Sequence, residues 1–380
     1  PGSEQEWRLR HLAGGDALAD EALDTAVELI HARRAEEFTR FDGNLESVVG
    51  LPDYADGTAL ISPTALERFA GCPHAFFVER MLNVKPLETP EEIITIRPWD
   101  LGSMVHEVMD RLTTEAELLP GYGEPWSAAD RERMREIMAE VMADYERRGL
   151  TGHPRLWDRE RERLHQDLEA ILDLDDEAHH TRDSRVVASE LSFGMRGHTP
   201  VRIELGTGAI AMRGSADRVD ETRGGTLIVT DFKTGSSGGF TDIHEDPVVA
   251  GKKLQLPLYA HAARAAFGND TVEAGYWFIG RRDRGKRVDV RLDANLEKIY
   301  REALETLVTG IREGRFIARP PASDDFSWVQ CAFCNPDGVG YGHVRGSSER
   351  KRTDPALAGL FSLLDPSVLP ATNPSGETSE

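Results

Sequence analysis

Cysteine and long apolar runs are both scarce in this sequence. Three cysteines occur among 380 residues, which is too few for a disulfide framework. No stretch approaches the roughly 18 consecutive apolar residues that a membrane-spanning helix needs. The first residues also show no charged segment followed by an apolar one. These absences predict a reducing, cytoplasmic setting and no membrane partner.

Positive charge is the second scarcity. Lys and Arg number 45 against 66 Asp and Glu, which gives a net charge of -21. Such a balance excludes a protein that coats nucleic acid over its whole surface, because phosphate contacts come mainly from Lys and Arg. A nucleic-acid substrate must therefore be bound locally. One concentrated basic segment exists, although charged loops of this kind are usually only solvated; it contains Arg281, Arg282, Arg284, Lys286 and Arg287.

A phosphate-binding loop of the G-x-x-x-x-G-K-[ST] type is also missing. The chain therefore cannot by itself be an ATP-driven motor.

The pattern of apolar residues that is present predicts an α/β fold with a mixed central sheet flanked by helices. Strands are expected within 185–233 and around 272–279 and 287–292. Helices are expected at 62–81, 101–113, 129–175, 252–267 and 294–313, and a helical insertion at about 115–180. Composition divides the chain into a charged linker or N-terminal extension (1–60), a folded domain (61–346) and a flexible tail rich in Ser, Pro, Thr and Glu (347–380).

The most informative segment runs from Met212 to Gly235. Two strand-like halves flank Arg223-Gly224-Gly225, which predicts a β-hairpin. With a loop of three or five residues, Asp217 lies directly opposite Asp231 with their Cβ atoms roughly 5 Å apart. Lys233 shares a strand face with Asp231, because side chains two apart point the same way. Two carboxylates and an ammonium are therefore expected at one place.

Such a cluster suits a divalent cation and a phosphate. Close carboxylates repel each other unless a cation lies between them, and Mg²⁺ prefers oxygen ligands. An isolated Asp-x-Lys is more often an ordinary solvent-facing pair. Here, however, the charges follow the apolar run Leu227-Ile228-Val229, and charges at the end of a buried strand need partners.

Six blocks in this order resemble the PD-(D/E)XK nucleases of the RecB and AddB type. The hairpin is similar to two of that family's motifs, through Gly214-x-x-Asp217-Arg218-x-Asp220 and Asp231-Phe232-Lys233-Thr234-Gly235. The other four blocks are Gly102-x-x-x-His106, the strand glutamate Glu190, Gln255-x-x-x-Tyr259, and the opening segment from Ser62 through Cys72-Pro73 to Phe76. The resemblance spans residues 62 to 334 and implies a restriction-endonuclease-like core with metal-dependent DNA nuclease activity.

The resemblance also implies roles for single residues. His106, Asp217 and Asp231 would bind Mg²⁺ or Mn²⁺, with the Phe232 carbonyl as a further ligand, and Lys233 would be the electrostatic catalyst. Glu190 would assist through water or a second metal. Gln255 and Tyr259, one helical turn apart, would contact phosphates or bases. Taken alone, His106 could be a boundary histidine, Glu190 an edge residue, and the Gln255–Tyr259 pair a structural hydrogen bond.

The cysteines form a second candidate site. In the resembling nucleases, one upstream cysteine and a C-x-x-C-x₅-C cluster hold a [4Fe-4S] cluster. Cys72, Cys331 and Cys334 match three positions, but the fourth is Gly340. Asp337 and His343 are nearby substitutes, so an iron-sulfur cluster, a zinc ion and three unligated thiols all remain open.

The function expected from the resemblance is that of the exonuclease module of a helicase-nuclease in DNA double-strand break repair. Its partners would be DNA, particularly single-stranded ends, and a helicase domain or subunit outside this chain. The alternative is a catalytically inactive module that keeps the nuclease shape and only holds DNA. Retention of all five core positions favours activity.

Overall fold

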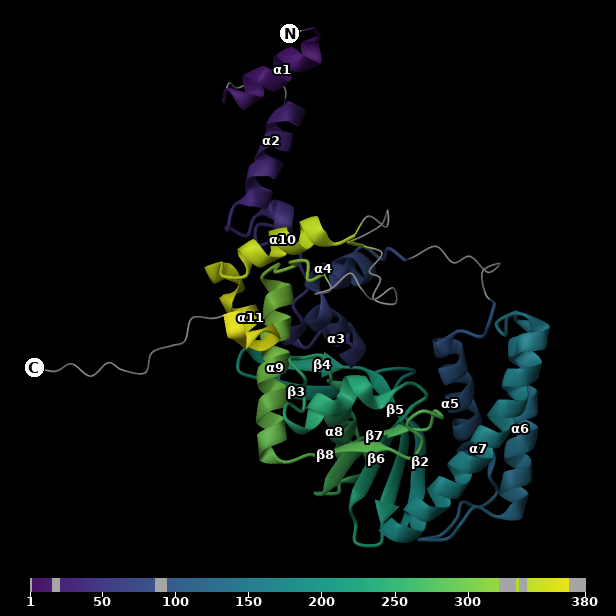
Figure 1. Cartoon of the computed structure of the whole chain (residues 1–380). Coiled ribbons are helices and arrows are strands. Elements are labelled where there is room, and N and C mark those ends of the chain that lie inside the picture. The colour runs from purple at the N-terminus through teal and green to yellow at the C-terminus, as the bar shows by residue number, and fades with distance from the viewer. Residues whose placement is uncertain (1, 16–20, 86–93, 321–332, 335–339, 369–380) are drawn as a thin grey trace, which may run out of the picture. The chain divides into compact units, whose positions relative to one another are not determined.

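The computed structural model describes residues 2–15, 21–85, 94–320, 333–334 and 340–368 (Figure 1). The chain divides into two compact units. One contains residues 54–64 and 86–304, and the other contains 1–53, 65–85 and 305–380. No helix of the described residues is long and apolar enough to cross a membrane.

A five-stranded mixed sheet forms the centre of the first unit, in the order β2-β5-β6-β7-β8. Neighbouring strands are antiparallel except β6 and β7, which are parallel. The α/β fold predicted from the sequence is therefore confirmed. The strands are β2 (Ser184–Phe193), β5 (Gly214–Thr222), β6 (Leu227–Lys233), β7 (Val272–Phe278) and β8 (Arg287–Arg291).

The β5–β6 hairpin has the register that the sequence predicts. The Thr222 N–H donates to the Thr226 carbonyl at 2.9 Å, which leaves a three-residue loop, and Gly225 takes the left-handed conformation there at φ +83°. The paired register ends with Arg218 opposite Thr230. Asp217 and Asp231 are the next pair along the two strands.

A separate three-stranded sheet was not expected from the sequence. Its order is β1 (Leu60–Ile61), β4 (Gly208–Met212) and β3 (Val201–Leu205). The β3–β4 hairpin lies between β2 and β5 in the chain, yet it pairs with β1 and not with the larger sheet. Alternation alone cannot decide which strands pair, because it reports only which face of a strand is buried.

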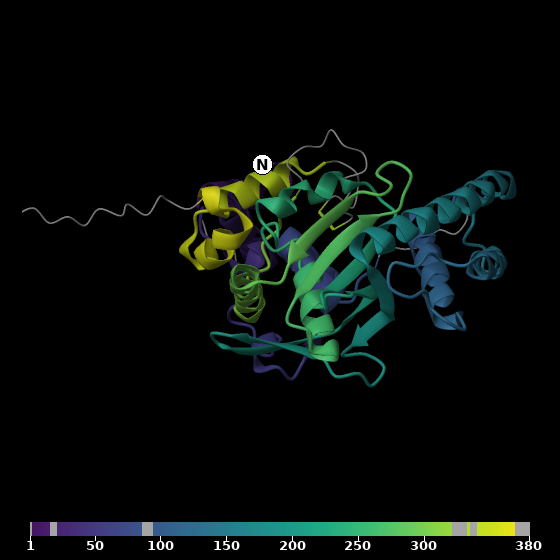
Figure 2. The same ribbon diagram turned by 90° about the horizontal axis from the view of Figure 1, so that it is seen from below.

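Helices cover both faces of the larger sheet. The face with Phe232 and Trp277 packs in one apolar core with α5 (Pro98–Glu115), α6 (Ala128–Arg147) and α7 (Pro154–Arg182). These three helices gather on one side of the strands in both views (Figures 1 and 2). Lys233, the neighbour of Phe232, points to the opposite face and reaches α8 (Gln255–Phe267).

The predicted helix over 129–175 is two helices in the structure. The break between α6 and α7 contains Gly149 at φ +70° and Gly152 at φ +75°, followed by Pro154 at the first position of α7. A Cβ atom on Gly152 would lie 2.5 Å from the Ile94 carbonyl oxygen, so only glycine fits this close approach. The helical insertion is therefore a pair of helices joined by a tight turn.

The second unit holds mostly short helices. α9 (Ala294–Arg312) crosses from the first unit into it. The remaining helices are α1 (Glu4–Ala13), α2 (Glu21–Arg34), η1 (Arg40–Asp42), α3 (Pro63–Gly71), α4 (Pro73–Phe76), the π-helix η3 (Phe77–Met81), α10 (Gly342–Lys351), η6 (Pro355–Leu357), α11 (Ala358–Leu364) and η7 (Pro366–Val368), of which α3 begins in the first unit.

Residues 347–368 differ from the flexible tail that composition predicts. Leu357 and Phe361 are buried in one cluster with Phe38. The fully buried ammonium of Lys351 donates to the carbonyls of Ala32 and Ala35, at 2.7 Å each, and so binds the end of α2. Composition misses this because a few apolar residues at helical spacing, and one buried lysine, are enough to fold a polar segment.

Candidate metal centre

Three acidic or imidazole side chains from three separate elements converge beside the β5–β6 hairpin. His106 of α5, Glu190 of β2 and Asp217 of β5 each place one ligand-type atom within 4.8 Å of the other two. Within the part of the chain that the structure describes, they form the one group of three or more His, Cys, Asp or Glu residues with this spacing. All three were candidates from the sequence.

The backbone of Phe232 holds two of these side chains in place. Its N–H donates to Asp217 Oδ2 at 2.6 Å, and its carbonyl oxygen lies 3.0 Å from His106 Nε2. The other imidazole nitrogen, Nδ1, lies 3.3 Å from Asp217 Oδ1. A neutral imidazole has one N–H and can donate to only one of these oxygens. The second contact therefore requires either the imidazolium form or a cation shared by the ring nitrogen and the carboxylate.

Glu190 reaches the site through an irregular strand. Alternation places it on the face of Val186 and Ala188, but a bulge between those two residues shifts the register. Glu190 itself has φ +47°, a left-handed conformation that is strained for a residue with a β-carbon. Its carboxylate accepts a hydrogen bond from Ser215 Oγ at 2.7 Å. Burial raises the pKa of Glu190, and the nearby negative charge of Asp217 adds to this despite the opposing Ser215 hydrogen bond.

Asp231 and Lys233 form an ion pair next to this group. Lys233 Nζ also donates to Gln255 Oε1 of α8 at 3.2 Å and lies 5.0 Å from the centre of the Tyr276 ring. Asp231 is 4% exposed, and burial raises its pKa to about 6 against the lowering effect of Lys233. One turn beyond Gln255, the buried Tyr259 packs its ring edge against Phe193 at 6.2 Å.

The charges at the site are unbalanced toward the negative. Glu190, Asp217 and Asp231 supply three carboxylates, while Lys233 is, among the described residues, the one lysine or arginine whose ammonium or guanidinium forms an ion pair with them. Burial lowers the pKa of His106, but the hydrogen bond and charge of Asp217 outweigh this and leave it raised. Close carboxylates with an imidazole nitrogen are a donor set that suits Mg²⁺ or Mn²⁺. The residues therefore fit the divalent ion that the sequence resemblance implies.

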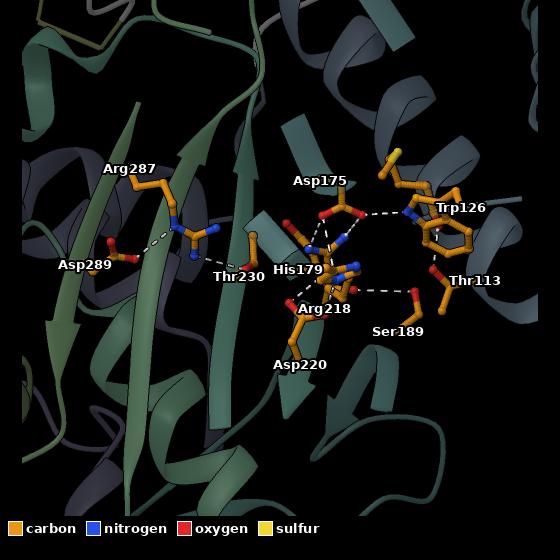
Figure 3. Close-up of polar contacts among 12 residues, drawn as sticks. Thr113, Trp126, Asp175, His179, Ser189, Arg218, Asp220, Thr230, Arg287 and Asp289 are labelled. Carbon is orange, nitrogen blue, oxygen red and sulfur yellow. Dashed lines mark hydrogen bonds and ion pairs between the residues drawn. The ribbon is translucent and has the colours of Figure 1, made fainter. Parts of the chain in front are cut away.

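Behind Asp217 lies a buried ionic network that sequence reasoning missed (Figure 3). Arg218 is 3% exposed and donates to both oxygens of Asp175, at 2.7 and 2.9 Å, and to Asp220 at 3.1 Å. Asp175 also accepts from Trp126 Nε1 at 2.8 Å, and His179 Nε2 lies 3.3 Å from Asp220. The Asp-Arg-x-Asp spacing pointed to Arg218 and Asp220. Nothing local pointed to Asp175, because it lies on the charged helix α7.

The basic segment at 281–287 is paired within the chain. Arg281 and Arg284 form ion pairs with Asp167 of α7. Lys286 pairs with Asp283 and Arg287 with Asp289. These contacts offset most of the positive charge that the sequence had offered for phosphate binding.

Two of the three cysteines can be placed. Cys72 and Cys334 are both buried, and Cys72 Sγ accepts a hydrogen bond from the Arg319 N–H at 3.3 Å. Cys334 lines a cavity of about 900 Å³ together with His74 and His343. Cys331 and Asp337 lie outside the described residues, and Gly340 offers no side-chain ligand. The described residues therefore do not assemble a four-ligand cluster site.

Comparison with known proteins assigns the family. The model of the PD-(D/E)XK nuclease superfamily matches residues 60–338. Subunits of ATP-dependent helicase/deoxyribonucleases are similar over 53% of this chain in Clostridium tetani (28% identity), 54% in Acetivibrio thermocellus (30%) and 65% in Thermoanaerobacter pseudethanolicus (26%). The chain covers 17%, 18% and 21% of these relatives, about a fifth of their length. A solved structure, the crystal structure of SSO0001, covers 64% of this chain and 84% of its own at 16% identity and a TM-score of 0.21, from which nothing further follows. With about three quarters of its length matched by the family model, the chain belongs to the PD-(D/E)XK nuclease superfamily.

Proposed function

We propose that this chain is a metal-dependent deoxyribonuclease that hydrolyses DNA phosphodiester bonds without a covalent intermediate. The observation that carries the proposal is the convergence of His106, Glu190 and Asp217 beside the Asp231–Lys233 pair. Excess negative charge at one edge of a sheet is costly unless a cation is bound there during function.

Each residue has a proposed role. His106, Asp217 and Asp231 would hold Mg²⁺ or Mn²⁺, with the Phe232 carbonyl as a further ligand and Glu190 acting through water or a second ion. When bound, the ion would polarise the phosphodiester and make water acidic enough to attack it. Lys233 orients that water or stabilises the charge that develops on the phosphate. Gln255 holds the Lys233 ammonium in position, and Tyr259 supports β2 from the same helix through its contact with Phe193.

The finer proposal concerns the whole assembly. The chain would be the exonuclease module of a helicase-nuclease that processes broken DNA ends, with the helicase in a domain or subunit outside it. The descriptions of the relatives support this, although they share only about a fifth of their length with this chain. The missing phosphate-binding loop agrees, since unwinding must then be supplied elsewhere. The nuclease domain would span 61–346, with the helical insertion at 115–180.

A cleavage assay with matched variants tests the chemistry. The purified chain is incubated with labelled single-stranded and blunt duplex DNA, with Mg²⁺, Mn²⁺ or a chelator. We expect metal-dependent cleavage that Asp217→Asn lowers at least about a hundredfold, the scale of loss typical for a group that stabilises transition-state charge. Asp173→Asn, an exposed carboxylate on α7, serves as the control and should cleave like the parent.

The outcomes separate the alternatives. Cleavage in chelator would contradict the metal role. Binding of metal and DNA without cleavage would identify the inactive DNA-holding module instead. Lys233→Met should lose turnover yet bind Mn²⁺ in calorimetry like the parent. Blunt duplex cut as fast as single strands would contradict a dependence on a separate helicase.

A further inference from the structure

Trp99, near the start of α5, carries a large apolar surface into solvent. Its side chain is 63% exposed, whereas Trp126, Trp157 and Trp277 are buried. The Arg97 guanidinium lies over its ring, 5.0 Å from the ring centre. An exposed tryptophan under a guanidinium gives a flat aromatic surface with positive charge beside it.

The helix geometry relates Trp99 to the metal centre. Trp99 and His106 are seven residues apart, which is about 20° short of two full turns and about 10 Å along the helix axis. They therefore share one face of α5. Asp110, a further four residues on, lies on this face too and accepts a hydrogen bond from Ser189 of β2 at 2.6 Å.

The same face of the helix meets the end of β6 between Trp99 and His106. A Cβ atom on Gly102 would lie 3.4 Å from Thr234 Oγ1, and Thr234 directly follows Lys233. This face thus passes from β2 at Asp110, across the metal centre at His106, past the end of β6 at Gly102, and ends in solvent at Trp99. A chain extended along α5 from the metal centre would next reach the indole ring.

We propose that Trp99, with Arg97 above it, is a stacking platform for an unpaired base of single-stranded DNA whose phosphodiester lies at the metal centre. The inference rests on the proposed function and adds its substrate class. The base would stack on the ring face away from Arg97, within a few nucleotides of the bond that is cut. Duplex DNA would be excluded from this contact, because its bases are already stacked on each other.

The charge of the chain favours this occupant. With a net charge of -21 and the 281–287 segment paired internally, phosphate contacts can supply little affinity. Stacking on an aromatic ring needs no counter-charge and tolerates any base sequence. An apolar protein surface is disfavoured, because covering Trp99 would also remove the Arg97 guanidinium from water.

The test measures binding and cleavage separately. Binding of a labelled oligothymidylate to the full chain is followed by fluorescence anisotropy in Ca²⁺, with Trp99→Ala, Trp99→Phe and, as control, Trp7→Ala, which removes another exposed tryptophan (45%). Trp99→Ala should weaken single-strand binding about 5- to 150-fold, the range for one lost stacked base. Trp99→Phe should recover most of it, and Trp7→Ala should bind like the parent. Duplex binding should be the same in all four.

Oligonucleotides with a single abasic site at successive positions identify the stacked base. One position should weaken binding to the parent and have no effect on Trp99→Ala. An effect of equal size in both proteins, or parent-like binding by Trp99→Ala, overturns the platform. Loss of duplex binding alongside single-strand binding overturns it too. In cleavage assays Trp99→Ala should raise KM and leave kcat unchanged. If no variant cleaves DNA, the proposed function fails while the anisotropy result still decides the platform.

Discussion

Replacing Arg218 by methionine tests whether the buried network behind Asp217 holds the hairpin to the helical insertion. Methionine has a similar length and no charge, so the change leaves Asp175 and Asp220 buried without their cation. Asp175 is 0% exposed and Asp220 is 3% exposed. Removing one partner of a buried ion pair costs about 3–5 kcal/mol, because the remaining charge is uncompensated. That is a large share of the roughly 5–15 kcal/mol that stabilises a typical domain.

The effect of pH follows from the carboxylate. Burial by itself raises the pKa of Asp175, but Arg218 and His179 outweigh it and hold the pKa below its ordinary value. In the parent this carboxylate contributes stability above its unfolded pKa, and the contribution disappears as pH falls through the folded pKa. Without Arg218, burial dominates and the carboxyl binds a proton more readily. The deficit of Arg218→Met should therefore be largest at pH 7 and shrink toward pH 4.

Hydrogen–deuterium exchange in β5, β6 and α7 is the suitable assay, since it reports on this unit without requiring two-state unfolding of the whole chain. Arg147→Met is the matched control, because the side chain is 69% exposed and its ion pair with Asp144 is worth less than about 1 kcal/mol. Asp175→Leu combined with Arg218→Met should recover part of the loss. Arg218→Met with no more effect than Arg147→Met would refute the role given to the network.

Three further predictions concern the site and the cysteines. The pKa of Asp231 is raised to about 6, so its ionisation opposes folding. Stability of the metal-free chain should rise as pH falls from 7 toward 4, and Asp231→Asn should reduce this dependence; urea midpoints that do not differ between the two proteins would contradict it. Glu190→Gly should be more stable than Glu190→Ala by about 1 kcal/mol, the reverse of the usual order, because only alanine retains the cost of the left-handed backbone. Both should bind Mn²⁺ more weakly than the parent, and an alanine variant of equal or greater stability would remove the case for strain. If Cys72 and Cys334 bind a metal or cluster with Cys331, protein purified without oxygen should contain iron and sulfide or zinc that Cys72→Ser loses; absence of all three would show that packing alone holds this region.

Local sequence patterns were sufficient for the hairpin and its charges. The alternation on either side of Arg223-Gly224-Gly225 and the loop length fix which residues face each other across two adjacent strands. For that reason the pairing of Asp217 with Asp231, and the neighbouring Lys233, could be predicted without a structure. The order of the motifs along the chain was likewise enough to identify the superfamily.

Contacts between distant segments could not be predicted in this way. The bulge in β2 and the left-handed Glu190 change the face on which a carboxylate lies, and alternation assumes that neither occurs. Asp167 and Asp175 were two acidic residues among many on a charged helix until packing set one beside Arg281 and the other beside Arg218.

By itself, the sequence determined the secondary structure of the hairpin, the α/β class and the chemistry of the metal centre, because these depend on residues close together in the chain. The tertiary structure alone decided which charges are neutralised and which carboxylate joins His106 and Asp217. It also decided that the face of α5 ends in an exposed Trp99. The physical reason is that the worth of a charge or an aromatic ring depends on its burial and partners, and these are set by elements folded together from across the chain.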